Sequence, residues 1–412
     1  EGMDGKEDRQ DRQDREDGED GEEGLEETVA QFARRRFGAE AVEALVEPLV
    51  TGIFAGDAAR LSMQAAFPRI AELERKHGSL VRGMLASARQ QRAARRAEQR
   101  AGKREELSLE QLVASTATPR PATIPPVTSR GRRRSTLWAP VAGTGALAKA
   151  LASALGSRAR TNARVTGLEM LPGSAVPART RVVLADGSSI DADVVALAVP
   201  TRTSAALIAP HDARLAELLD GIPYVSAVVV HVGIERKLVA HELNGFGFLV
   251  ANGEEPRCLG CLMESSLWPR RAPPGSVLLR LIYGGARDPR AIELSDEAMR
   301  AIVAADLRLC LGVAVAPSFF HLVRHARALP QYEIGHKQRV AAAEKLAAAL
   351  GWILAGNAFH GVSANDCVKD ALRVADLVEA RLVALEASKL AVGNSPRRAV
   401  GCSPIPVRKT EQ

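Results

Sequence analysis

The sequence predicts a mixed α/β fold, in the broad α+β sense, with a helical segment placed before a domain of strands and helices. Apolar residues recur at helical spacing from residue 29 to residue 49. From about residue 160 the pattern changes to short β-rich runs separated by turn signals. With 412 residues, 46% of them hydrophobic, the chain can bury the cores of two or three domains.

The helical part is expected to begin at about residue 26. An apolar stripe starts at Val29 and reaches Leu49 at intervals of three and four residues. Residues 66–99 also have a helical pattern, and they become strongly basic after Arg82. Residues 115–135 are rich in proline, threonine and arginine without a clear period, which predicts a loop or linker.

The later part of the chain is expected to alternate strands and helices. Strands are predicted at four runs, namely Arg181–Ala185, Asp193–Val199, Val225–Ile234 and Val277–Tyr283, and Phe319–Arg324 is a further candidate. Near the carboxyl end we expect a helix at 336–350, a short buried strand at Trp352–Leu354 and a final helix from about Asp366 to Ala387.

Charge is unevenly distributed along the chain. Residues 1–27 hold fourteen Asp or Glu and four Lys or Arg, a local charge of −10, so the remainder of this chain of net charge +6 carries +16. An acidic run with few apolar residues cannot bury enough surface to fold, so residues 1–24 are expected to be disordered. The basic remainder favours an acidic partner, either a nucleic acid, an anionic membrane or an acidic small molecule.

Cysteine usage and hydropathy indicate the compartment. The five cysteines are scattered, which argues against a disulfide framework and for a reducing environment. No apolar stretch reaches about 18 residues, so no transmembrane helix is expected. The acidic start does not resemble a signal peptide. We therefore expect a cytoplasmic protein, peripherally associated with a membrane, although an organelle is not excluded.

The strand, turn and helix near the carboxyl end carry the best chemical signal. Gly356 and Gly361 are small enough for a ligand to approach the backbone closely. Asn365 or Asp366 could cap the following helix, whose amino end offers free N–H groups to an anion. The alternative is an ordinary capped helix after a buried strand, and spacing alone favours that alternative.

Other short motifs are weaker. Cys258 and Cys261 have the spacing of half a zinc site, but no second pair follows, so buried core cysteines are expected. Gly143-Thr144-Gly145 lacks the spacing of a phosphate loop. His321 and His325 fall in a strand-like run, where residues four apart do not converge on a metal. No metal site is predicted.

The basic residues between 82 and 104 could bind nucleic acid or phospholipid, or could form a solvated helix face. Aromatic residues are almost absent there, so base stacking, and with it a nucleic-acid partner, is not expected. A membrane surface is easier to reconcile with the run, because each basic residue near anionic lipid contributes about 1 kcal/mol.

Two stretches resemble protoporphyrinogen oxidase. The first is Phe32–Gly38 with Val46–Asp57, and the second is Leu354–Cys367. Shorter matches between them keep the same order, namely Gly245–Val250, Leu259–Gly260, Ser265–Pro269, Gly284–Pro289 and Pro330–His336. The likeness spans about residues 26–390, and the carboxyl-terminal stretch looks more like the bacterial, myxobacterial-type enzymes.

The resemblance implies an FAD-dependent flavoprotein of the amine-oxidase-like superfamily. Such enzymes oxidise protoporphyrinogen IX to protoporphyrin IX in heme biosynthesis and pass the electrons to molecular oxygen. The flavin carries the chemistry, so no catalytic side chain is expected. The implied partners are the porphyrinogen, oxygen, a peripheral membrane surface and a second copy in a homodimer.

The resemblance also assigns residues. Val165 would meet the adenine, and the flavin ring would lie against the segment that contains Gly356, Asn357, Gly361, Val362, Ser363 and Ala364. The apolar walls of the porphyrinogen pocket would be Phe246, Leu249, Leu262 and Ile282. Exchanging Gly361 for leucine is predicted to block flavin approach and leave the fold largely intact.

The chain departs from the family pattern at its start. Family members begin with a strand and a G-x-G-x-x-G motif that holds the FAD pyrophosphate, whereas an acidic run stands here. The fold class is therefore an FAD/NAD(P)-binding-type domain that lacks its first βαβ unit, with a mixed-sheet substrate domain and a helical membrane-associated insert. The expected division is a disordered acidic segment (1–24), a helical membrane-binding and substrate insert (25–135), part of the FAD-binding domain (136–200), a mixed β-sheet substrate domain (201–335), a carboxyl-terminal FAD-binding element (336–392) and a disordered tail (393–412).

Two alternatives stay open. The substrate could be coproporphyrinogen III instead of protoporphyrinogen IX. The chain could also be a flavin-less relative that binds a tetrapyrrole or a membrane without redox activity.

Overall fold

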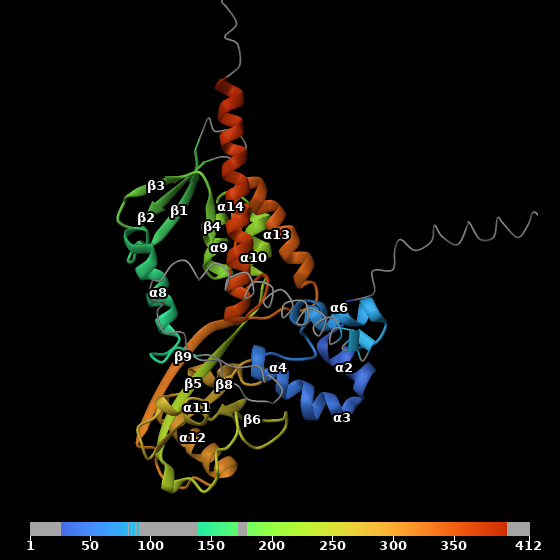
Figure 1. Ribbon diagram of the computed structural model, residues 1–412, viewed down its shortest axis with the longest axis vertical. Coiled ribbons are helices and arrows are strands. Elements are labelled where there is room, and N and C mark those ends of the chain that lie inside the picture. Colours follow the sequence, from blue (N-terminus) through green and yellow to red (C-terminus); the bar gives the residue numbers. More distant parts are fainter. Residues whose placement is uncertain are drawn as a thin grey trace, which may run out of the picture. The chain divides into compact units, whose positions relative to one another are not determined.

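The computed structural model describes residues 26–80, 139–171 and 179–393, with Arg82, Gly83, Leu85, Ala86 and Arg89 in addition (Figure 1). The predicted disorder of 1–24, the linker at 115–135, most of the basic run at 82–104 and the tail lie outside these residues. The described chain forms two compact units. The first contains residues up to Thr161 and Tyr224–Lys337, and the second contains Asn162–Pro223 and the residues from Gln338 onward.

Helices of the first unit open the described chain. They are α2 (Val29–Phe37), α3 (Ala39–Ala41), the π-helical turn η2 (Val42–Val46), α4 (Glu47–Phe54), α5 (Met63–Ala66), α6 (Pro68–His77), α8 (Gly145–Leu155) and the 3₁₀ turn η3 (Gly156–Arg158). A capping box between Thr28 and Gln31 starts α2. The predicted continuous stripe is interrupted at Gly38, whose φ of +87° ends the helix.

The helix predicted at 66–99 is also interrupted. It is broken at Phe67, between α5 and α6, and again after His77, because Gly78 has a φ of +64° and closes α6 in a left-handed cap. His77 therefore ends a helix, as its position before a glycine suggests. In the part of the chain that the structure describes, no helix is both long and apolar enough to cross a membrane.

A five-stranded antiparallel sheet is the centre of the first unit. Its order is β6-β7-β8-β5-β9. The strands are β5 (Tyr224–Glu235), β6 (Gly247–Leu249), β7 (Gly260–Leu262), β8 (Ser276–Gly284) and β9 (Phe319–Pro330). Between them lie the short helices η4 (Arg236–Leu238), α11 (Glu264–Leu267), η5 (Pro269–Arg271) and η6 (Pro289–Glu293), and the longer α12 (Asp296–Leu311).

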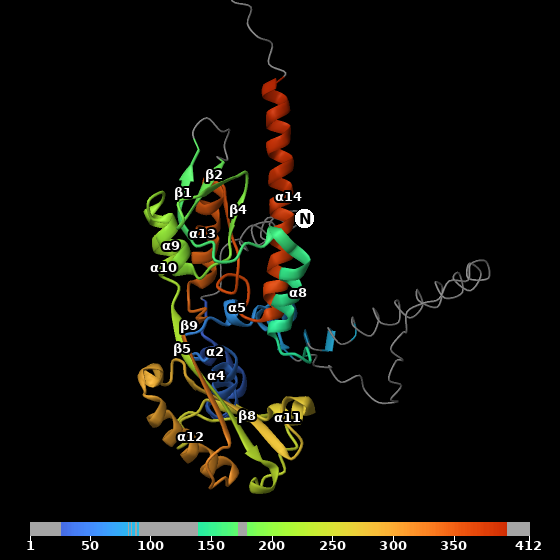
Figure 2. The same cartoon turned by 90° about the vertical axis from the view of Figure 1, so that its left-hand side faces the viewer.

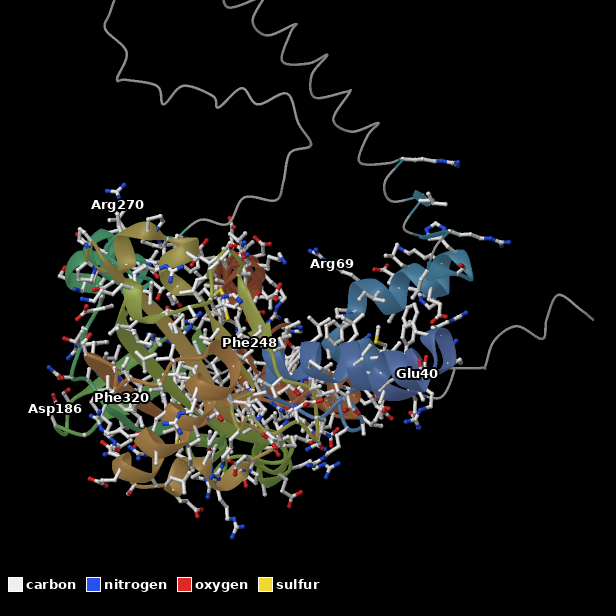
Figure 3. The ribbon with its side chains drawn as sticks, turned by 90° about the horizontal axis from the view of Figure 1, so that it is seen from below. Glu40, Arg69, Asp186, Phe248, Arg270 and Phe320 are labelled. Atoms are coloured by element: carbon white, nitrogen blue, oxygen red, sulfur yellow. The ribbon has the colours of Figure 1, made fainter. Side chains whose placement is uncertain are left out.

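One face of this sheet is covered by α12 (Figure 2). Side chains alternate along each strand, so every second residue points to α12. The core on this side contains Val230, Leu281 and Cys261 from the strands and Met299 and Val303 from α12. Phe248 and Phe320, both labelled in Figure 3, pack against the same core. The opposite face, which we call the free face, is the one that α12 does not cover.

Asp306 fastens α12 to the sheet. It is buried, and its two carboxylate oxygens accept hydrogen bonds from the backbone N–H groups of Arg257 (3.1 Å) and Cys258 (2.9 Å), just before β7. A buried carboxylate that accepts two backbone donors stabilises the fold, because either donor would otherwise be left without a partner in the interior.

We expect Asp306→Asn to lower the free energy of unfolding by about 2 kcal/mol, because the amide offers one acceptor and turns a donor toward the other N–H. The control is Asp296→Asn in the first turn of the same helix. Asp296 is exposed and pairs only with Arg324 among the described contacts, so a loss below about 1 kcal/mol is expected. Urea unfolding of both variants measures the two free energies of unfolding. Equal losses of stability would contradict the role given to Asp306.

The second unit contains two small sheets and their helices. One sheet is antiparallel, with strands β1 (Val165–Met170), β2 (Thr180–Leu184) and β3 (Ser189–Ala192). The other is a parallel pair of β4 (Val195–Leu197) and β10 (Trp352–Leu354). The helices are α9 (Thr201–Ile208), α10 (Ala213–Asp220), α13 (His336–Leu350, which starts in the first unit) and α14 (Ala364–Gly393).

Trp352 anchors the parallel pair. Its indole N–H donates to the Thr180 hydroxyl at 2.9 Å, and its ring stacks edge-on against His211. The ring nitrogen Nε2 of His211 lies 2.6 Å from the carbonyl oxygen of Leu168 in β1. The buried strand β10 is thereby connected to the antiparallel sheet, and its carboxyl end is held in place for the turn that follows.

Candidate functional site

The turn after β10 joins the carboxyl end of a parallel strand to the amino end of a long helix. Gly356 follows the strand at a φ of +116°, and α14 starts at Ala364. A Cβ atom built on Gly356 would meet nothing closer than the carbonyl oxygen of Ala198, at 4.0 Å. The open space lies at the carboxyl ends of β4 and β10, the edge of a parallel sheet where ligands bind.

A charged network behind the turn fixes it. The N–H of Gly356 donates to the Asp370 carboxylate at 3.0 Å. Arg373 donates to the same carboxylate at 2.8 Å and to the carbonyl oxygen of Leu354 at 3.1 Å. Glu344 of α13 pairs with Arg373 at 3.2 Å and with His360 at 2.8 Å. The network holds the two ends of the turn, at Leu354 and at the first turns of α14, in a fixed position.

Ser363 caps α14, which corrects the prediction that Asn365 or Asp366 does so. The Ser363 hydroxyl accepts from the Asp366 N–H at 3.1 Å and donates to the Asp366 carboxylate at 2.6 Å. Hydrogen bonds from Lys369 and Ser363 hold the pKa of Asp366 below its usual range. A Ser-x-x-Asp pattern is a variant of the capping box and could have been recognised in the sequence.

Gly361 has a local reason to be glycine. Its φ is +136°, and an added Cβ would lie 2.5 Å from the Asp366 Cβ. A leucine at this position would therefore displace the capping carboxylate of Asp366, and the prediction that the rest of the fold stays largely intact remains a prediction. Val362 is half-buried, whereas Ser363 and Ala364 are exposed, so all three can be reached by a ligand.

The remaining residues assigned to the cofactor lie in the same unit. Asn357 directly follows Gly356 and is half-buried. Val165 is the first residue of β1 and is also half-buried, so it belongs to the antiparallel sheet and not to the β4–β10 pair. The turn thus brings together six of the seven predicted cofactor residues, and Val165 stands apart from them in the fold.

Three predicted substrate residues share the free face of the five-stranded sheet. The register pairs Leu249 with Gly260 and Gly260 with Ile282. Opposite residues point to the same face, as do residues two apart on a strand, so Leu262 lies there too. Val229 and Val323 extend the line across the sheet. We call this line the apolar row (Leu249, Gly260, Ile282, Val229 and Val323).

Phe246, the fourth predicted substrate residue, precedes β6 and is exposed, and its carbonyl oxygen accepts from the Met263 N–H. Leu249 lies against α4, because a Cβ on Gly52 would come within 2.7 Å of its side chain. The helices at the start of the chain and the free face of the sheet therefore adjoin at Leu249.

Sequence reasoning missed a second row next to the apolar row. The register places Leu262, Arg280, His231 and His321 opposite one another on four strands. Period-two alternation could have shown that Arg280 shares a face with Ile282, two residues away. We call this set the polar row (Leu262, Arg280, His231 and His321).

The cysteines and histidines of the weak metal motifs lie in the five-stranded sheet or next to it. Cys258 and Cys261 are both fully buried, as predicted, and burial raises the pKa of the Cys261 thiol to about 12. His321 and His325 both lie in β9. Gly145 starts α8 and does not follow a strand. The described residues contain no group of three or more side chains able to hold a metal ion.

Comparison with known proteins shows which family the chain resembles. The profile of the family described as flavin containing amine oxidoreductase matches residues 6–379. Coproporphyrinogen III oxidase of Bacillus subtilis is 29% identical over 83% of this chain and 65% of its own length. Protoporphyrinogen oxidase of Macaca fascicularis is 30% identical over 85% of this chain and 68% of its own length.

A solved structure agrees in fold. A protein from Exiguobacterium, provisionally assigned as a protoporphyrinogen oxidase, superposes with a TM-score of 0.65 at 24% identity, covering 86% of this chain and 67% of that one. The chain spans slightly less than two thirds of the Bacillus relative. Because the family profile matches most of the sequence, the chain belongs to the flavin containing amine oxidoreductase family.

Proposed function

We propose that this chain oxidises protoporphyrinogen IX to protoporphyrin IX with FAD as its cofactor and oxygen as the electron acceptor, in heme biosynthesis. The observation that carries the proposal is that this family member has two sites suited to the two reactants. One is the glycine turn at the start of α14, and the other is the apolar row on the free sheet face. Relatives named for porphyrinogen oxidation support the choice of substrate.

The turn suits a flavin ring. Gly356 leaves open space at the carboxyl ends of two parallel strands. Val362, Ser363 and Ala364 lead into α14, and the positive dipole end of this helix favours negative charge. When bound, FAD supplies the hydride acceptor. The residues of the chain hold the ring and orient it, and Asp370 and Arg373 keep the turn in shape.

The apolar row suits a tetrapyrrole. Leu249 and Ile282 of the apolar row and the neighbouring Leu262 present aliphatic side chains on one side of the sheet, and an apolar macrocycle can lie across such a face and exclude water from it. Phe246 directly precedes β6 and is exposed, and it is proposed as a further apolar residue of this wall.

The helical segment is proposed to lie on a membrane surface. Leu45, Leu49 and Ile53 are exposed at spacings of four residues, and Phe37 is exposed nearby. An exposed apolar stripe of this kind inserts into the lipid interface. Homodimer formation stays a prediction.

Flavin uptake tests the proposal against the flavin-less alternative. We expect the purified chain, mixed with FAD and freed of unbound flavin, to retain the visible absorbance of the cofactor. Val362→Trp is expected to weaken FAD binding at least about tenfold, since the indole would fill the space beside the ring. The control is Val383→Trp, an exposed position further along α14. A chain that stays colourless with FAD would reject the proposal.

A second substrate deserves the same assay, because the Bacillus subtilis relative is named for coproporphyrinogen III. We expect faster turnover of protoporphyrinogen IX. A higher kcat/KM for coproporphyrinogen III would move the assignment to that substrate and leave the cofactor unchanged.

A further inference from the structure

The polar row is a second feature of the free sheet face, and no assigned role accounts for it. Arg280 lies opposite Leu262 and His231, and His231 lies opposite His321. The imidazole rings of His231 and His321 have centroids 6.3 Å apart. Along the strands the polar row is displaced from the apolar row by two residues, or about 7 Å. The face is therefore divided into an apolar strip and a polar strip that run side by side.

Arg280 is held in place but keeps free donors. Its Nε lies 3.0 Å from an oxygen of Glu264, a buried carboxylate at the start of α11. Nε itself makes no hydrogen bond within the described residues, so the contact with Glu264 is an ion pair, and the four terminal N–H groups of the guanidinium can serve a further acceptor. The pair fixes the fork of Arg280 on the sheet before any ligand arrives.

The side chain of His231 is half-buried, and one of its two ring nitrogens lacks a hydrogen-bond partner within the described residues. This nitrogen is Nδ1, which is buried. That leaves Nε2 as the nitrogen able to meet a ligand. Burial lowers the pKa of His231, and the charges of Arg280 and His321 lower it further, while Glu264 raises it. A bound anion beside the ring would oppose the first three of these effects.

We propose that the polar row binds a carboxylate of the substrate through Arg280 and His231 while the apolar row contacts its ring, an assignment that rests on the proposed porphyrinogen oxidation. The ligand that fits both rows has an apolar body with a carboxylate at one edge. Protoporphyrinogen IX has this form, with two propionates on one side of the macrocycle. The two residues are positioning residues, because they orient the ring and take no part in hydride transfer.

The same contact predicts that binding of the carboxylate depends on pH. A carboxylate beside His231 raises the pKa of the imidazole, so the complex holds more protons than the free chain. Affinity for the acid should therefore rise as the pH falls through the pKa that His231 has in the complex, and level off below the lowered pKa that it has in the free chain. The other groups that face the ring are Arg280 on β8, Glu264 on α11 and His321 on β9.

The test compares protoporphyrin IX with its dimethyl ester, which has the same ring and no carboxylate. Binding to the full chain is measured by fluorescence titration and needs no turnover. We expect the acid to bind about tenfold more tightly than the ester. His231→Asn, and the double variant Glu264→Leu with Arg280→Leu, should each remove most of this preference by weakening the acid alone. The double variant removes both charges together and so leaves neither buried without its partner.

The control is Arg308→Leu, an exposed arginine of α12 on the other side of the sheet, which should keep the preference. Loss of the pH dependence in His231→Asn would further support the assignment. Equal binding of acid and ester by the unmodified chain, or an unchanged preference in both variants, would overturn the inference and leave the proposed function standing. If neither porphyrin binds, the proposed function fails and the inference fails with it.

Discussion

Replacing Gly285 by alanine is expected to lower the free energy of unfolding of the first unit by about 4 kcal/mol. Gly285 follows β8 at a φ of +67°, and an added Cβ would lie 2.3 Å from the carbonyl oxygen of Ala55. The same oxygen accepts the Ala286 N–H at 2.7 Å. This is the point where the end of α4 crosses the sheet, so the methyl group would push the amino-terminal helices away from the strands.

A second glycine with positive φ serves as the control, because it distinguishes the effect of the collision from that of backbone strain. Gly253 has a similar φ of +85°, but nothing lies within 4 Å of its added Cβ. Gly253→Ala should cost only the left-handed conformation, about 1 kcal/mol. Urea unfolding followed by circular dichroism compares the two. Similar losses would show that α4 and β8 do not approach as closely as described.

Leu249→Asp is expected to lower kcat/KM for protoporphyrinogen IX about a hundredfold, mainly through a higher KM. Leu249 lies at the end of the apolar row and is 46% exposed, so the fold tolerates a polar side chain there. A bound macrocycle would bury the new carboxylate against an apolar ring without a partner, which weakens ground state and transition state alike.

Leu238→Asp is the control for Leu249→Asp. Leu238 has a similar exposure of 40%, but it lies in η4, beyond the far end of β5. Its kinetics should match those of the unmodified chain. If both variants keep the original KM, the porphyrinogen does not contact the apolar row, and the assignment of Leu249 and Ile282 is wrong.

Strands with strong patterns could be predicted from the sequence. The β-branched runs at 225–234 and 277–283 lie within β5 and β8, and Trp352–Leu354 is β10. Their composition favours strands whatever their neighbours are. By contrast, β6 and β7 have three residues each and contain glycine, so they depend on pairing with β8 for their conformation. Local patterns cannot show such strands.

Helix α12 was missed for a related reason. Ser295 caps it and Gly312 ends it in a left-handed conformation, both of which are readable signals. Its apolar residues, however, include alanines and a buried Asp306, and the aspartate is explained only by two backbone donors far along the chain. Tertiary hydrogen bonds of this kind lie outside what periodicity can detect.

The candidate site also has one part that the sequence predicts and another that it does not. The glycine turn after β10 is contiguous in the sequence, so composition and resemblance were enough to single it out. The polar row comes from four different strands, and only the register of β7, β8, β5 and β9 brings its members together. The network of Glu344, Asp370 and Arg373 likewise joins two helices and a strand.

Flavin-dependent porphyrin formation tests the central claim most directly. Protoporphyrinogen IX is added in air to the purified chain with FAD, and the fluorescence of protoporphyrin IX is followed against the chain alone and FAD alone. We predict a rate that requires both the chain and FAD and that falls in Leu249→Asp but not in Leu238→Asp. A chain that holds FAD and yet forms porphyrin no faster than free FAD would contradict the proposed oxidation.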